Sequence, residues 1–147
     1  MWPKDPDEFI PNHVMPDGAD NDDAWYFVFL RGELICKTQH GVPTPITAGD
    51  YRWFDVDTHS KQFLGHHGSV SCFALKAEGS VPEGYSSVPL RALLGRTSQT
   101  LFYLAGRAQQ IVDWYETHQF CGRCGSTMAQ HPHDRAMSCE NCGHINY

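Results

Sequence analysis

Four cysteines near the C-terminal end of the sequence are the residues best suited to chemistry. They form two Cys-x-x-Cys-Gly segments, and fourteen residues separate the two cysteine pairs. One such pair grips a metal ion from one side, so two pairs make a closed tetrahedral site. Each following Gly allows a positive φ, which lets backbone N–H groups point at the sulfurs and offset their charge. The sequence therefore predicts a structural Zn2+ bound by Cys121, Cys124, Cys139 and Cys142.

The sequence alone also allows other roles for these cysteines. A disulfide within Cys-x-x-Cys is typical of redox enzymes and would occur once beside a βαβ unit, not twice. An iron centre is the chemical alternative, because tetrahedral sulfur sites suit both metals. Four neighbouring histidines are competing ligands, although four thiolates already complete the shell: His118, His131, His133 and His144. A closed shell leaves no position for water, so the metal is expected to stabilise and not to catalyse.

Composition limits the class of protein. The 147 residues suffice for one small domain followed by a metal-stabilised module. The net charge is -6, from 11 basic and 17 acidic residues, which disfavours general nucleic-acid binding. No apolar run reaches the ~20 residues of a membrane span, and the N-terminus lacks the order of a signal peptide. We therefore expect a cytoplasmic protein without a membrane partner, in which Cys36 and Cys72 are buried as small apolar side chains.

The elements preceding the cysteines predict an α+β fold. Residues 1–23 are rich in Pro and Asp and are expected to form a flexible acidic arm. Residues 24–97 are expected to form a mainly antiparallel sheet of about five strands. The predicted strands cover residues 25–30, 34–36, 51–56, 61–64 and 69–75.

Two helices are predicted after the sheet. Residues 88–94 begin near a Pro and end at Gly95, which favours a short helix. A longer helix follows over residues 98–118, with Thr97 or Ser98 as N-cap, because apolar residues recur there at helical spacing. It connects the sheet to a zinc ribbon over residues 119–147.

Three segments carry a resemblance to a known family: Leu101-Phe-Tyr-Leu-Ala-Gly-Arg-Ala, His118-Gln-Phe-Cys-Gly-Arg-Cys-Gly and Ala136-Met-Ser-Cys-Glu-Asn-Cys-Gly. They resemble the middle of the NADH pyrophosphatases, which are Nudix hydrolases. The resemblance is close over residues 98–147 and weaker over residues 24–97, where that family has a Nudix-like domain without an active site. It implies a homodimeric zinc-containing enzyme that cleaves NADH or NAD+ to mononucleotides. The resemblance also implies that some members of the family remove NAD caps from RNA.

The sequence departs from that family in one respect. Nudix catalysis requires a Gly-x5-Glu-x7-Arg-Glu-x2-Glu-Glu-x-Gly helix whose carboxylates hold Mg2+ or Mn2+ against the diphosphate. The 147 residues contain no such motif and therefore no catalytic residue of that kind. We expect a fragment of a longer enzyme, inactive alone, whose catalytic domain supplies the Mg2+ or Mn2+ site.

The same resemblance implies four substrate-binding residues. Tyr147 corresponds to an aromatic residue that leaves the ribbon and is suited to stacking on a nucleobase or nicotinamide. Arg91 corresponds to a phosphate-contacting arginine. Asp134 and Lys37 correspond to an acidic position before the third cysteine and a basic position after the second strand. For each of them, a solvated surface role is the alternative.

Three functions remain open on these grounds. The first is the non-catalytic part of an NAD(H) diphosphatase, which supports dimerisation and the substrate pocket. The second is a freestanding zinc-ribbon module that binds protein or nucleic acid, although Arg123 and Arg135 against Asp134 and Glu140 leave the ribbon without net charge. The third is a regulatory paralogue without hydrolase activity.

Overall fold

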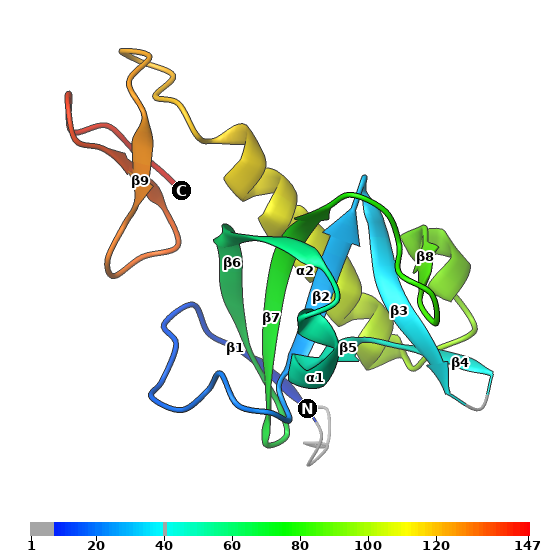
Figure 1. Ribbon diagram of the computed structural model, residues 1–147. Helices are drawn as coiled ribbons and strands as arrows, with labels where there is room; N and C mark the ends of the chain where they lie inside the picture. Colours follow the sequence, from blue (N-terminus) through cyan, green and yellow to red (C-terminus); the bar gives the residue numbers. More distant parts are fainter. Residues whose placement is uncertain (1–7, 40) are drawn as a thin grey trace. The chain divides into compact units, whose positions relative to one another are not determined.

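The computed structural model describes residues 8–39 and 41–147 and divides the chain into two compact units. The first unit ends at Val112, and the second comprises Asp113–Tyr147. The division falls inside the long helix α2 (Gln99–Thr117) (Figure 1). No helix in the described part of the chain has both the length and the hydropathy that a membrane crossing requires.

An eight-stranded sheet forms the first unit. Its main path has the order β1-β6-β7-β2-β3-β4, with β5 paired to β2 and β8 paired to β3. All pairs are antiparallel except β2 with β7, which are parallel. The strands are β1 (Phe9–Pro11), β2 (Trp25–Leu30), β3 (Glu33–Gln39), β4 (Val42–Thr44), β5 (Ile46–Thr47), β6 (Asp55–His67), β7 (Val70–Glu78) and β8 (Ser86–Val88).

The central strand β2 is buried on both faces, which explains its continuous apolar sequence. Because successive side chains point to opposite faces, Phe27 and Phe29 enter one core cluster, whereas Tyr26 and Val28 enter another. The turn from β2 to β3 uses Arg31 and Gly32, both with positive φ, as a two-residue hairpin requires. The predicted strand at residues 25–30 is confirmed.

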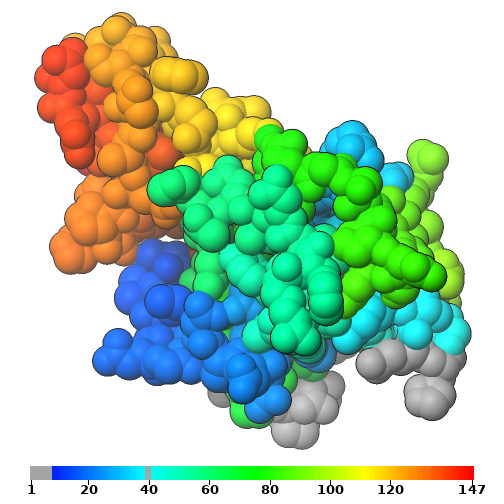
Figure 2. All heavy atoms as spheres, viewed as in Figure 1, coloured from blue at the N-terminus to red at the C-terminus, as the bar shows by residue number. Residues whose placement is uncertain are grey.

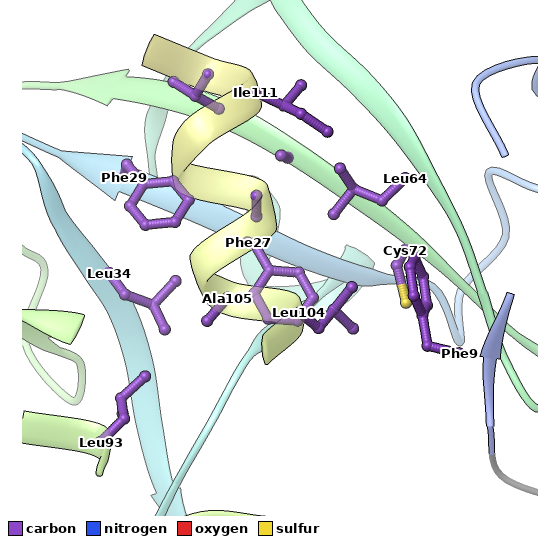
Figure 3. Packing of buried hydrophobic residues seen from close by; sticks show 13 residues of the cluster. Phe9, Phe27, Phe29, Leu34, Leu64, Cys72, Leu93, Leu104, Ala105 and Ile111 are labelled. Atoms are coloured by element: carbon purple, nitrogen blue, oxygen red, sulfur yellow. The ribbon is translucent and has the colours of Figure 1, made fainter. Parts of the chain in front are cut away.

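Helix α2 supplies the apolar side chains that cover one face of this sheet. Leu104, Ala105 and Ala108 are fully buried in the cluster that contains Phe27 and Phe29 (Figure 3). Small side chains at the two Ala positions let the helix backbone approach the sheet closely. Ser98 caps the helix, since the Leu101 N–H donates to its Oγ at 3.1 Å. The predicted long helix and its N-cap are therefore confirmed.

Two sequence-based predictions about the first unit were wrong, and a third, the short helix, was right only in part. Among the residues that the structure describes, the sheet has eight strands, where about five were expected. The expected strand over residues 51–56 is largely the end of helix α1 (Ala48–Tyr51) and a turn, and β6 begins only at Asp55. Thr47 and Asp50 form a capping box there, which outweighs the aromatic residues that favoured a strand. The expected short helix is a single 3-10 turn, η1 (Leu90–Leu93).

The described part of the predicted acidic arm packs on the sheet. Strand β1 pairs with β6, and Phe9 is buried in the core. Gly65 makes this possible, because a Cβ at that position would lie 2.1 Å from the carbonyl oxygen of Ile10. Further along, Asp20 accepts hydrogen bonds from the Tyr26 hydroxyl and from the Lys61 ammonium. Residues 8–23 therefore belong to the packed first unit. A few specific contacts hold this segment on the sheet, although it contains no long apolar run.

The second unit is a small three-stranded sheet beside the cysteines. Its strands have the order β11-β10-β9 and are β9 (Met128–Gln130), β10 (Met137–Cys139) and β11 (Ile145–Asn146). Both pairs are antiparallel. Its core consists of Met128, Met137 and two of the cysteines, with Trp114 and Tyr115 packed against them. Such a small core needs another source of stability.

Candidate metal centre and binding residues

Two loops with the same hydrogen-bond pattern position the four cysteines. In the first loop the N–H of Cys121 donates to Ser126 O at 2.7 Å, and Gly125 N–H donates to Cys121 O at 2.8 Å. In the second loop Cys139 N–H donates to His144 O at 2.8 Å, and Gly143 N–H donates to Cys139 O at 2.9 Å. Both glycines have φ 79°, as the Cys-x-x-Cys-Gly repeat predicted.

The loops bring four sulfur atoms together. All four Sγ atoms lie within 4.8 Å of one another, and two pairs across the loops are 3.6 Å and 3.4 Å apart: Cys121 with Cys142, and Cys124 with Cys139. A tetrahedral zinc with Zn–S bonds of about 2.3 Å would require sulfur separations of about 3.8 Å. The cluster therefore has the size and the donor set that a four-coordinate thiolate-bound metal needs.

Hydrogen bonds to sulfur favour the thiolate form. The Arg123 and Cys124 N–H groups approach Cys121 Sγ at 3.4 and 3.5 Å, and Cys142 N–H approaches Cys139 Sγ at 3.5 Å. The Asn141 side-chain amide lies 3.5 Å from Cys124 Sγ. Hydrogen bonds from Ser126 and Asn141 lower the pKa of Cys124 to about 5. These are the backbone and side-chain donors that offset thiolate charge.

Crowding of the sulfur atoms has the opposite effect on the pKa of the fourth cysteine, Cys142. A backbone hydrogen bond from His144 lowers the pKa of Cys142, but desolvation and the three neighbouring sulfurs outweigh it and raise the pKa to about 11. Four adjacent thiolates repel one another, so one of them retains its proton unless positive charge is supplied. A divalent metal supplies that charge and would allow all four to ionise.

Histidines take other roles in the second unit. Within the described residues, the group that can hold a metal consists of the four cysteines and includes no histidine. His131 Nδ1 accepts hydrogen bonds from the N–H groups of His133 and Asp134 at 3.2 and 3.0 Å, so it organises the turn between β9 and β10. His118 Nδ1 lies 2.6 Å from Trp114 O at the end of α2.

The four predicted substrate-binding residues are divided between the units. Lys37 and Arg91 belong to the first unit, where Lys37 lies 2.8 Å from Asp50 Oδ2 and Arg91 is exposed in η1. Asp134 and Tyr147 belong to the second unit, where both are exposed and Tyr147 retains 72% of its accessible surface.

Sequence reasoning missed the surroundings of Lys37. Asp50 is 8% exposed and also accepts hydrogen bonds from Tyr85 OH at 2.6 Å and from the Thr47 N–H at 3.0 Å. Burial opposes its ionisation, but these donors and Lys37 outweigh burial and lower the pKa of Asp50 to about 2. Desolvation and the Asp50 charge raise the pKa of Tyr85 to about 12. No local sequence motif links these residues, which come from three separate segments.

Comparison with known proteins places the two units in one family. The model of the NADH pyrophosphatase-like rudimentary NUDIX domain matches residues 23–114, and the model of the NADH pyrophosphatase zinc ribbon domain matches residues 116–147. The chain belongs to the NADH pyrophosphatase-like NUDIX family. The four clustered cysteines all lie within the stretch that the zinc ribbon model matches.

Relatives of this NUDIX family member carry the name NAD-capped RNA hydrolase NudC. The protein from Deinococcus radiodurans is 33% identical over 138 residues, which are 94% of this chain and 45% of the relative. The protein from Stutzerimonas stutzeri is 40% identical over 90 residues, 60% of this chain and 32% of the relative. One from Pseudomonas fluorescens is 41% identical over 95 residues, 63% of this chain and 34% of the relative. The chain thus spans less than half the length of these relatives.

Proposed function

We propose that this chain is the N-terminal and zinc-ribbon part of an NADH pyrophosphatase. The whole enzyme would hydrolyse NAD(H) at the diphosphate to NMN(H) and AMP, and would act on NAD-capped RNA. The observation that carries this proposal is the succession of the two family domains along the chain, in the order NUDIX-like and then zinc ribbon. The names of the relatives support the RNA substrate.

A structural Zn2+ held by the four cysteines is part of this proposal. The size of the sulfur cluster, the N–H groups directed at it and the small core of the second unit all support such a role. The ion would fold the ribbon and would leave no coordination position for water. Catalytic Mg2+ or Mn2+ would be bound by carboxylates of the NUDIX hydrolase domain, outside these 147 residues.

The chain's own residues would contribute to substrate binding and assembly. Tyr147 would stack on a base or on nicotinamide, Asp134 would accept hydrogen bonds from sugar or base, and Arg91 and Lys37 would contact phosphate. We include a homodimer in the proposal. Light scattering of the purified protein tests the dimer, because a monomer at micromolar concentration would contradict it.

The reading frame and the activity of its product test the proposed function. We expect codons beyond Tyr147 to encode the NUDIX helix motif, and the full product to release AMP from NADH with Mg2+. The 147-residue chain alone is expected to release none. A stop codon directly after Tyr147, or AMP release that scales with the amount of the 147-residue chain, would contradict the proposal.

A further inference from the structure

A pocket in the first unit lies beside helix α1 and is separate from the cysteines. Its cavity volume is 490 Å3, within the range of about 300–1,000 Å3 that small-molecule sites occupy. Figure 2 shows the atoms of α1 and of the segment before β8 side by side on the face turned to the viewer. The pocket is lined by Lys37, Trp53, Pro82, Glu83, Gly84 and Tyr85.

Buried contacts hold the walls of this pocket in place. Asp50 lies outside the lining and binds both Tyr85 OH, at 2.6 Å, and Lys37 Nζ, at 2.8 Å. The Phe54 ring packs edge-on against the Tyr85 ring with centroids 5.0 Å apart. Two lining residues from distant segments are thus tied to one buried carboxylate, so the pocket is preformed.

One wall offers an aromatic surface. The Trp53 side chain is 60% exposed although it lines the pocket. The Arg52 guanidinium lies 5.2 Å from its ring centroid, which restrains the indole. An exposed, restrained indole beside a tyrosine ring is a platform on which a planar heterocycle can stack.

Two side chains of opposite charge line the pocket. The Lys37 ammonium uses one of its three N–H donors on Asp50, and its side chain is 31% exposed. Glu83 presents an exposed carboxylate, which is an acceptor only. A ligand that satisfies both needs an anionic group for Lys37 and an N–H donor for Glu83.

We propose that this pocket binds a mononucleotide whose base carries an exocyclic amine. The base stacks on Trp53, the amine donates to Glu83, and the phosphate accepts from Lys37. The inference rests on the proposed function only in assigning Lys37 to a phosphate. The other two contacts, and a complete site within the first unit, go beyond it.

Titration of the zinc-loaded 147-residue chain with AMP tests the inference, followed in NMR spectra through the indole N–H signal of Trp53 and, in all variants, through the backbone amide signals of the lining residues Gly84 and Tyr85. We expect saturable shifts at millimolar AMP or below. Trp53→Ala should weaken binding about tenfold, as loss of one stacking surface does. Tyr103→Ala removes another exposed aromatic residue of the first unit and should leave the affinity unchanged. Absence of a saturable shift at Trp53, or equal weakening by both variants, would overturn the proposal.

Matched ligands test the two polar contacts. Adenosine lacks the phosphate and inosine monophosphate lacks the amine, so each should bind at least about fivefold more weakly than AMP. Lys37→Gln should abolish the preference for AMP over adenosine, and Glu83→Gln should reduce the preference for AMP over inosine monophosphate. Equal affinity for the three ligands would overturn the proposal. Hydrolysis by the full enzyme is a separate readout. Loss of the Trp53 shift in the Tyr147→Ala protein would also overturn the proposal, because the site would then depend on the ribbon.

Discussion

Asp50 combines a local contact that caps a helix with long-range contacts to two other side chains of the first unit. Its carboxylate caps α1 through Thr47 and also binds Lys37 and Tyr85. The same contacts that hold the pocket lower its pKa from 3.8 to about 2. The ionised form is therefore the one that stabilises the fold.

The Asp50 contacts predict a defined pH dependence. A carboxyl group whose pKa is lower in the folded state adds stability above its unfolded value, and that stability is lost as the pH falls from about 4 to about 2. The shift corresponds to about 2 kcal/mol. Asp50→Asn should lower the free energy of unfolding of the first unit by that amount at pH 7. It should also reduce the further decrease in this free energy as the pH falls from about 4 to about 2. Denaturant titration measures both effects.

An exposed aspartate provides the control for this variant. Asp22→Asn removes a carboxylate of the same unit and should change the free energy of unfolding by less than about 0.5 kcal/mol. If Asp50→Asn were equally neutral at pH 7, the Asp50 contacts would contribute nothing to stability.

Each of the four clustered cysteines should be required for metal binding by the second unit. Cys139→Ser removes a buried sulfur atom from the cluster, so zinc should fall from about one ion per chain to less than half. Elemental analysis measures this content. Cys36→Ala changes a buried cysteine of the first unit and should leave the zinc content unchanged. Full zinc content in the Cys139→Ser protein would show that this sulfur is not a ligand.

At the scale of elements, the sequence predicts those whose local signal is strong. Strand β2 and helix α2 carry long apolar patterns, and the cysteine loops carry a repeated motif with two glycines. Strand β1 and helix α1 are short, and long-range partners stabilise them. Local propensity does not contain those partners, and the Thr47–Asp50 capping box is too short a signal to outweigh the aromatic residues that favoured a strand, so neither element was predicted.

Strand β1 gives a direct test of such a long-range contact. Gly65 has φ 132°, and an added Cβ would meet Ile10 O at 2.1 Å and Asn12 N at 2.9 Å. Gly65→Ala should therefore displace β1 and expose the backbone amides of Phe9, Ile10 and Asn12 to hydrogen exchange. We expect a cost of about 1–3 kcal/mol. Gly49→Ala meets nothing within 4 Å and should leave exchange there unchanged. Unaltered protection in the Gly65→Ala protein would show that β1 does not pack on β6 as described.

The whole molecule combines a unit with two apolar core clusters and a unit with one small cluster. The candidate metal centre was predictable because its four cysteines lie within two short motifs. The Lys37 pocket was not, because its lining comes from β3, the turn after α1 and the segment before β8. A sequence motif identifies functional residues that are close along the chain. Residues that are far apart along the chain come together only in the folded structure.

This division predicts two responses to metal removal. A chelator should collapse the amide signals of residues 119–147, since that unit has little core, and should preserve those of β2, β6 and β7. NMR spectra before and after chelation measure both responses. Loss of all dispersed signals would show that the two units fold as one.

X-ray absorption at the zinc edge distinguishes a closed zinc site made only of sulfur from a site with other ligands. We predict about one zinc per chain, surrounded by four sulfur atoms at about 2.3 Å with no nitrogen or oxygen neighbour. A shell that contains nitrogen or oxygen, or a protein that is isolated with iron in this site, would contradict the claim.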